Sequence, residues 1–209
     1  MDLNAHTIDA RRLWSSAREA GRALPLQLPP VLVFTDPGRS ADPAALAKAL
    51  PAGWALVYRH FGAGNRYEIA SDLAKLAHIR HFELIIGADA PLAKQVGAAG
   101  VHWPQSMARE ARRWISQFRV STMSAHAPSD VIGAPVEGID ARVLSTVFSS
   151  QSPSAGRPLG PVRFRAMAIR AQIPIYALGG VDSTSAGFIS KFSGLAGVGQ
   201  MVQLDRKAP

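Results

Sequence analysis

In the stretch IPIYALGGVDSTS, residues 173–185, a short apolar segment runs directly into two glycines and a cluster of small polar residues. The apolar segment 174–178 is too short for a typical helix and suits a buried strand. A pair of glycines lets the backbone turn and approach a ligand closely, and Asp182 or Ser183 can then cap a helix. This order of signals predicts a strand, a turn and a helix.

The same succession recurs along the chain, with short apolar runs separated by segments of helical character. Strands are predicted at residues 31–35, 54–58, 82–86, 100–103, 119–123, 141–148, 174–178 and 195–199. Helices are predicted at 43–50, 67–79, 90–99, 107–118, 128–133, 160–171 and 183–192. Strands that alternate with helices pair in parallel through right-handed crossovers. An open doubly wound sheet also satisfies this alternation, but the strand count favours a (β/α)8 TIM barrel, which is an α/β fold.

Residues 1–30 precede the first predicted strand, and we expect them to form a helical extension of a barrel domain at 31–209. At helical spacing one face is mainly apolar, and the arginines of this segment lie largely on other faces. We expect the apolar face to cover the bottom of the barrel or to form a subunit contact; a membrane-surface or partner-binding helix is the alternative. The apolar face comprises Leu13, Trp14, Ala17, Ala20, Gly21 and Leu24.

The composition is typical of a globular protein with one sizeable core, because the 209 residues are 47% hydrophobic. No apolar run reaches the roughly 18 residues of a membrane span, and the first segment lacks the apolar core of a secretory signal. We therefore expect a cytoplasmic protein without a membrane partner. The absence of cysteine excludes disulfides, thiolate metal sites and cysteine nucleophiles.

The charge balance favours anionic partners, since 23 Lys and Arg residues outnumber 15 Asp and Glu residues and give a formal charge of +8. The arginines are scattered, and no helix-turn-helix, zinc-finger or aromatic RNA-binding motif accompanies them. We therefore expect a phosphorylated small-molecule ligand and no nucleic-acid partner. A homo-oligomer is compatible with the sequence, which leaves the oligomeric state open.

Glycines at two successive strand ends predict a phosphate-binding site. Gly179 and Gly180 follow the seventh predicted strand, and Gly199 and Gln200 lie at the end of the eighth. In (β/α)8 barrels the loops after these two strands commonly form a phosphate cup from backbone N–H groups. Tight turns without a ligand are the alternative.

Six segments resemble, in order and spacing, the family of thiamine-phosphate synthases and TenI-like thiazole tautomerases. They are LVFTD (32–36), LIIGADAPLA (84–93), GAAGVHWPQ (97–105), STMSAH (121–126), TVFSSQSPSAGRPLG (146–160) and the segment 173–202. The resemblance covers most of residues 31–204 and implies a (β/α)8 barrel that binds a phosphorylated heterocycle. A synthase of this family joins a pyrimidine diphosphate to a thiazole phosphate, and Mg²⁺ neutralises the departing pyrophosphate.

The chain departs from the synthase pattern at the metal-binding positions. Of the Gln-x-Arg-x-Lys pattern after the second strand only Arg59 is kept, and the Asn-Asp pair after the third strand is replaced by Gly87 and Ala88. Met107 replaces the Asp of the loop after the fourth strand. By resemblance both usual carboxylate ligands of the metal are missing.

Replacement ligands and hydroxyl groups are still present near these positions. Mg²⁺ is expected only if Asp36 or Asp89 binds it, and we favour helix or turn capping as the role of these two residues. The Thr-x-Thr-Lys loop after the sixth strand corresponds to Ser150, Gln151, Ser152 and Pro153. Ser150 and Ser152 offer hydroxyls to a substrate, but the loop carries no ammonium group.

A metal-free thiazole tautomerase is the second function that the resemblance implies. His126 matches the position at which tautomerases carry a catalytic histidine, and imidazole suits a general base at neutral pH. We expect Arg59 to point into the barrel and pair with a phosphate or carboxylate. His102 and Gln105 could hold or stack a heterocycle, and packing of His102 in the barrel rim is the alternative. The third hypothesis is a catalytically silent barrel that binds a phosphorylated ligand or a partner protein.

Overall fold

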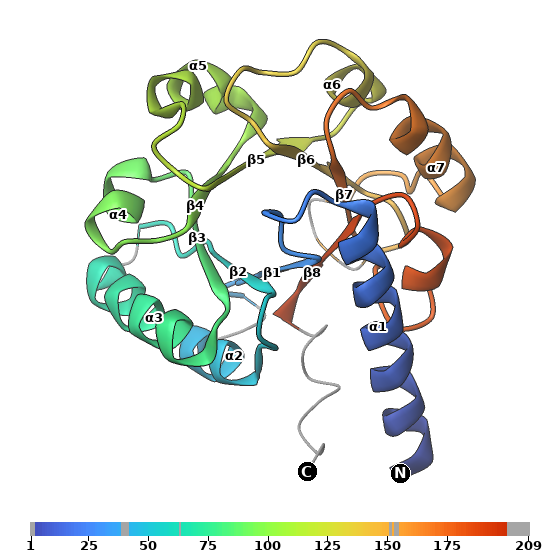
Figure 1. Ribbon diagram of the computed structural model, residues 1–209, viewed down its shortest axis with the longest axis horizontal. Helices are drawn as coiled ribbons and strands as arrows, with labels where there is room; N and C mark the ends of the chain where they lie inside the picture. The colour runs from blue at the N-terminus through green and yellow to red at the C-terminus, as the bar shows by residue number, and fades with distance from the viewer. Residues whose placement is uncertain (1–2, 39–41, 63, 151, 153–154, 200–209) are drawn as a thin grey trace.

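The computed structural model describes residues 3–38, 42–62, 64–150, 152 and 155–199, and it confirms the (β/α)8 barrel (Figure 1). Eight parallel strands pair in chain order, and pairing of the first with the last closes the barrel. The strands are β1 (Val31–Phe34), β2 (Ala55–Tyr58), β3 (Glu83–Gly87), β4 (Gly100–Trp103), β5 (Val120–Ala125), β6 (Ala141–Ser145), β7 (Ile175–Leu178) and β8 (Gly194–Val198).

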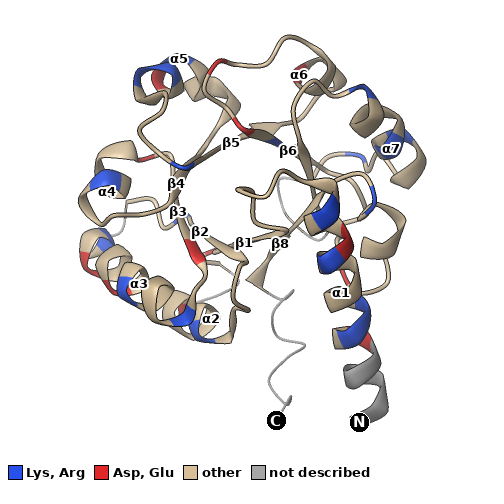
Figure 2. Cartoon of the chain, viewed as in Figure 1, with Lys and Arg blue, Asp and Glu red and all other residues tan. Residues whose placement is uncertain are grey.

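Helices surround the strands, as Figure 1 shows. The α-helices are α1 (Leu3–Ala23), α2 (Pro43–Ala49), α3 (Arg66–Arg80), α4 (Ala90–Gln95), α5 (Ala108–Ala111), α6 (Pro128–Ile132) and α7 (Pro161–Arg170). Three short 3₁₀ helices are η1 (Gln105–Met107), η2 (Arg112–Trp114) and η3 (Ala186–Phe188). Figure 2 shows Lys and Arg spread over the outer helices from α1 to α7, which matches the scattered arginines of the sequence.

Three predicted helices are shorter than expected. The helix predicted at 90–99 is α4, which ends at Gln95, just before Gly97 with its positive φ of 66°. The segment 107–118 is divided among η1, α5 and η2, and Ser116 adopts the left-handed conformation with φ 60°, which prevents a continuous helix. The segment 183–192 contains only η3.

Asp182 caps the turn that precedes η3. Its Oδ1 accepts hydrogen bonds from the backbone N–H groups of Thr184 and Ser185 at 2.9 and 2.8 Å. This is the usual N-terminal capping contact, in which a side-chain oxygen accepts from the N–H groups two and three residues further on. Asp182 is therefore the capping residue in this loop, where the sequence left Asp182 and Ser183 as alternatives. The segment stays short because the backbone leaves helical values at Ile189, where φ is −128° and ψ is −18°.

Alternating strand residues divide the core into two parts. One set faces the helices, and the other fills the barrel interior. The interior cluster also contains Leu24 and Leu28, which belong to the connection between α1 and β1. This connection, and not α1 itself, therefore closes the amino end of the barrel. The strand residues of the interior cluster are Leu32, Phe34, Ala55, Val57, Ile85, Val120, Ala141, Val143, Tyr176 and Ala196.

Tyr176 ties that connection to the barrel wall. Its hydroxyl donates a hydrogen bond to the Pro29 carbonyl at 2.7 Å, and the ring is fully buried. Gly194 on the neighbouring strand makes room for this ring, because a Cβ there would lie 2.2 Å from Tyr176 Cδ1. Burial also raises the pKa of the Tyr176 hydroxyl, which keeps the group protonated as a donor.

Helix α1 packs on the outside of the barrel, against β8 and η3. Its buried face contains Leu13, Ala17 and Ala20, as predicted, but Trp14 is 37% exposed and lies with its ring centroid 5.6 Å from that of Trp54. The apolar stripe is thus used by the chain's own barrel. No helix in the described part of the chain is long and apolar enough to cross a membrane.

Replacing Tyr176 by Phe should lower the free energy of unfolding by about 1–2 kcal/mol, because the buried Pro29 carbonyl loses its donor while the ring still packs. Equilibrium urea unfolding at neutral pH measures this change. Tyr67 on α3 is 47% exposed, and Tyr67→Phe is the matched control that should change stability by less than about 0.5 kcal/mol. Equal effects of the two substitutions would contradict the importance of the buried bond.

Candidate functional site

The carboxyl ends of the eight parallel strands form one ring, which we call the carboxyl-end rim. Arg59 follows β2, His126 follows β5, Gly179 follows β7 and Gly199 follows β8. Closure of the barrel therefore brings residues that are far apart in the sequence to the same end of the molecule.

Arg59 lies over the barrel interior, while His60 faces outward. The Arg59 Nε donates to the Thr35 carbonyl at 3.1 Å, and its Cζ lies 4.9 Å from the centroid of the interior residue Phe34. His60 stacks on the outward-facing ring of Tyr58 at a centroid distance of 5.0 Å. Arg59 thus points inward, as expected, and strand alternation turns its neighbour His60 outward.

His102 belongs to the wall of the barrel. It is 6% exposed, and its two ring nitrogens lie 2.9 Å from Thr122 Oγ1 and 3.0 Å from Ser124 Oγ. Burial lowers the pKa of His102 to about 3, and the charges of Arg59 and His126 act in the same direction. His102 is therefore a neutral ring with both nitrogens bonded to β5, as the packing alternative expects. A contact with a heterocycle stays a prediction.

His126 occupies an exposed position just after β5. Its Nδ1 lies 3.1 Å from Ser145 Oγ at the end of β6. Asp130 holds the backbone of the same loop, because its Oδ2 accepts from the N–H groups of His126 and Ala127, each at 2.9 Å. His126 thus combines a fixed backbone with an accessible imidazole, which is what a general base requires.

Gln105 makes a contact that the sequence did not predict. Its Oε1 accepts a hydrogen bond from Arg142 Nη1 at 2.5 Å, and Arg142 is only 2% exposed. The Nε of Arg142 has no partner within the described residues. The signal for this buried pair in the sequence was Arg142, a charged residue inside the apolar run ARVLS. Binding of a heterocycle by Gln105 stays a prediction.

Gly179 and Gly180 have positive φ angles of 96° and 63°. A Cβ at Gly180 would lie 2.2 Å from the Ser149 carbonyl oxygen, and one at Gly179 would lie 2.7 Å from Thr146 Cγ2. Both glycines are thus required by the close approach of the loop after β6. Their carbonyls accept hydrogen bonds from Phe148 N and Ser185 Oγ, at 2.9 and 3.0 Å respectively.

The N–H groups of the same two glycines donate no hydrogen bond to another residue in the described ranges. Two such donors beside a strand end are suited to an anion. In the loop after β6, Ser150 Oγ accepts from Ser152 N at 3.3 Å. Gly199 is buried at the end of β8, and Gln200 lies outside the described residues.

Asp89 and Asp36 serve the backbone, as the capping alternative expects. Asp89 Oδ1 accepts from Leu92 N at 2.9 Å at the start of α4, and its Oδ2 pairs with Arg66 Nη1 at 2.5 Å. Asp36 Oδ1 accepts from Gly38 N at 3.0 Å. Across the ranges that the structure describes, no three His, Asp or Glu side chains are grouped to hold a metal ion.

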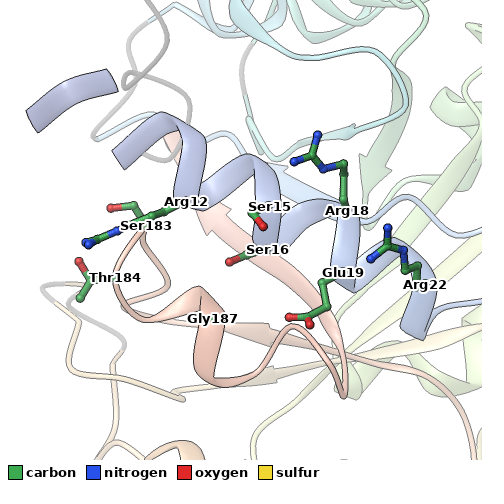
Figure 3. Close-up of a pocket in the computed structure, with 9 residues that line it drawn as sticks. All are labelled: Arg12, Ser15, Ser16, Arg18, Glu19, Arg22, Ser183, Thr184 and Gly187. Carbon is green, nitrogen blue, oxygen red and sulfur yellow. The ribbon is translucent and has the colours of Figure 1, made fainter. Parts of the chain in front are cut away.

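A polar recess lies apart from these residues, between α1 and the connection from β7 to β8 (Figure 3). Its volume is about 730 Å³. Figure 3 shows Arg12 beside Ser183 and Thr184, whereas Arg18 and Arg22 extend near the other end of the helix segment. The arginines do not converge on one point, and no predicted site residue lines the recess.

Comparison with known proteins gives a family match over the whole barrel. The profile of the family described as "Thiamine monophosphate synthase" (TMP-TENI) matches residues 31–201. A thiamine-phosphate synthase of Chloroflexus aurantiacus is 31% identical over 184 residues, which cover 83% of this chain and 85% of that protein. A thiamine-phosphate synthase of Synechococcus sp. (strain WH7803) is 31% identical over 162 residues, or 73% of this chain, but the match spans only 46% of that relative.

Among solved structures, the thiamine phosphate pyrophosphorylase from Pyrococcus furiosus superposes with a TM-score of 0.69. The match covers 84% of this chain and 93% of that structure, at 19% sequence identity. At this identity the likeness supports the fold alone, and it agrees with the closed barrel.

His102 should make the protein less stable as the pH falls below 6.5. The unfolded ring takes up a proton near the ordinary pKa of 6.5, whereas the folded ring does so only near 3, so acid favours the unfolded state. The free energy of unfolding should fall by about 1.4 kcal/mol per pH unit, or about 2 kcal/mol at pH 5, from this residue.

Urea unfolding at pH 7 and pH 5 measures the effect of His102. His102→Gln keeps hydrogen-bonding groups without titrating and should remove about 2 kcal/mol of the pH dependence. His78→Gln, at an exposed position on α3, is the control that should leave the pH dependence unchanged. An unchanged pH dependence in His102→Gln would contradict the buried neutral state.

Proposed function

Because the chain belongs to the thiamine monophosphate synthase family, we propose that it forms thiamine phosphate from a pyrimidine diphosphate and a thiazole phosphate. The observation that carries this proposal is the family match across residues 31–201, the whole barrel. In this reaction the thiazole nitrogen forms a bond to the pyrimidine methylene carbon, and the bond from that carbon to the diphosphate oxygen breaks. Pyrophosphate leaves with the electron pair.

Two groups on the carboxyl-end rim support the binding of phosphorylated substrates. The N–H groups of Gly179 and Gly180 have no acceptor among the described residues, and a phosphate oxygen can supply one. Arg59 brings a positive charge to the barrel interior, where it contributes to the lowered pKa of His102. We assign the thiazole phosphate to the loop of Gly179 and Gly180, which we call the glycine loop, and the diphosphate to Arg59.

The divalent metal that the family resemblance implies does not fit the residues that are present. Asp89 caps α4 and pairs with Arg66, and Asp36 accepts from the Gly38 backbone. In the described part of the chain, neither carboxylate belongs to a group of three or more His, Asp or Glu side chains that could hold a metal ion. We therefore route no step through a metal, and Arg59 carries the electrostatic stabilisation of the leaving pyrophosphate.

The test is product formation by the purified full chain, followed by phosphorus NMR, in Mg²⁺ and in EDTA. Loss of a dominant electrostatic stabiliser costs about 100-fold or more, so we expect Arg59→Gln to lose about that factor and EDTA to cost less than about 10-fold. Arg113→Gln, an exposed arginine paired with Glu110, is the matched control. Absence of thiamine phosphate from the folded protein would overturn the proposal, and a large EDTA effect would overturn the role given to Arg59.

A metal-free thiazole tautomerase is the second candidate, and the contact between His126 and Ser145 favours it. Moving a proton on a thiazole carboxylate phosphate needs an anion cup and a base, without a metal. The glycine loop and His126 provide these two functions in this proposal. The tautomerase proposal requires no metal, so it is not weakened by the loss of the carboxylates that would bind one.

His126→Ala should lower tautomerase turnover by about 10²–10⁴-fold, because the general base is removed. Proton NMR of the two substrate tautomers measures turnover, and calorimetry with the thiazole phosphate measures binding, which should change by less than about threefold. Unchanged turnover would rule out His126 as the base. Tight ligand binding without either reaction in the unmodified protein would support the catalytically silent barrel instead.

A further inference from the structure

The pairing of β5 with β6 places a hydroxyl beside the exposed histidine of the rim. Ala125, the last residue of β5, is in register with Leu144, so His126, which follows β5, lies near Ser145 at the end of β6. The side chains meet, with His126 Nδ1 3.1 Å from Ser145 Oγ. This contact is fixed by the barrel register and joins residues 19 positions apart in the sequence.

The backbone of His126 is already held by a separate group. Asp130 accepts two N–H hydrogen bonds from this loop, and neither involves the imidazole ring. These bonds hold the backbone and leave the orientation of the ring to the contacts of the ring itself. Ser145 is the one residue bonded to Nδ1 within the described ranges, and Nε2 has no hydrogen-bond partner there.

A neutral imidazole carries a proton on one nitrogen and a lone pair on the other, and the partner of one nitrogen sets the state of both. If Nδ1–H donates to Ser145 Oγ, the lone pair is on Nε2, the nitrogen that is open to a ligand. If Nε2 accepts a proton, Nδ1–H continues to donate to the same oxygen, so the hydrogen bond is also kept in the imidazolium form.

We propose that Ser145 is a positioning residue that holds His126 in the Nδ1–H tautomer with Nε2 as the proton acceptor. The role rests on the proposed use of His126 as a base, but the tautomer itself is a property of the ligand-free protein. Ser145 acts through His126 and is not assigned a contact with the substrate.

The first test is nitrogen-15 NMR of the histidine rings in the ligand-free full chain at pH 8, which reports the tautomer without any assay of activity. We expect His126 to show a protonated Nδ1 and an unprotonated Nε2, and Ser145→Ala to give a mixture of tautomers. Ser145→Thr keeps the hydroxyl and should restore the single tautomer. A protonated Nε2 in the unmodified protein, or identical spectra for the alanine variant, would overturn the proposal.

The second test is kinetic and uses the tautomerase assay. Loss of a residue that orients a functional side chain typically costs 10–100-fold, so Ser145→Ala should lower kcat by about 10-fold or more, with KM changed by less than about threefold. Ser145→Thr should recover most of kcat. Ser129→Ala, at an exposed position on α6, is the control and should match the unmodified protein.

The two readouts separate the failure of this proposal from the failure of the proposed function. A protein with the predicted tautomer and no tautomerase activity would refute the function of His126 as a base while supporting the positioning by Ser145. An active protein whose His126 tautomer and kcat are insensitive to Ser145→Ala would refute the positioning role alone. A similar loss of kcat in Ser145→Thr would also overturn it, because the hydroxyl would not be the group that matters.

Discussion

Hydrogen bonds between β1 and β8, the first and last strands, turn an open parallel sheet into a closed barrel. This pairing closes eight parallel strands into a ring, so that every strand delivers its carboxyl end to the same rim. Arg59, His126 and Gly179 follow three different strands and share an end of the molecule only because of this closure. The same closure creates an interior whose amino end is sealed by Leu24 and Leu28.

The interior changes character along its axis, from apolar side chains to a polar layer near the rim. In that layer His102 satisfies both ring nitrogens with hydroxyls of β5, and burial keeps the ring neutral. Arg59 adds a fixed positive charge nearby, over the ring of Phe34. The barrel thus separates a neutral wall histidine from His126, which stands exposed at the rim. Depth in the barrel therefore decides which of the two imidazole rings is accessible: His102 is 6% exposed, whereas His126 lies at an exposed position.

Carboxylates near the rim are used to shape backbone. Asp89 caps α4, Asp130 holds the loop of His126, and Asp182 closes the turn after the glycine pair. Each carboxylate that accepts backbone N–H groups has less capacity left for a cation. In the described residues these carboxylates serve the loop backbone, and no three His, Asp or Glu side chains are grouped to hold a metal ion there.

The sequence by itself determined the fold, because strand and helix periodicity are local and each predicted strand overlaps an observed one. It also placed Arg59, His126 and the two glycines at strand ends, since those positions follow from the strand boundaries. The helix expected at 183–192 is shortened to η3 because the backbone leaves helical values at Ile189, where φ is −128°, and hydrophobic periodicity does not register such a local change.

Only the tertiary structure decided what the polar residues contact, because these contacts depend on register between strands that are distant in sequence. Gln105 follows β4 and meets Arg142 of β6, whereas His126 follows β5 and meets Ser145 of β6. Both contacts depend on the successive pairing of β4, β5 and β6. The need for glycine at residue 180 likewise arises from the approach of the Ser149 carbonyl, on another loop. Local sequence pattern specifies the elements, whereas barrel closure and register select which side chains become partners.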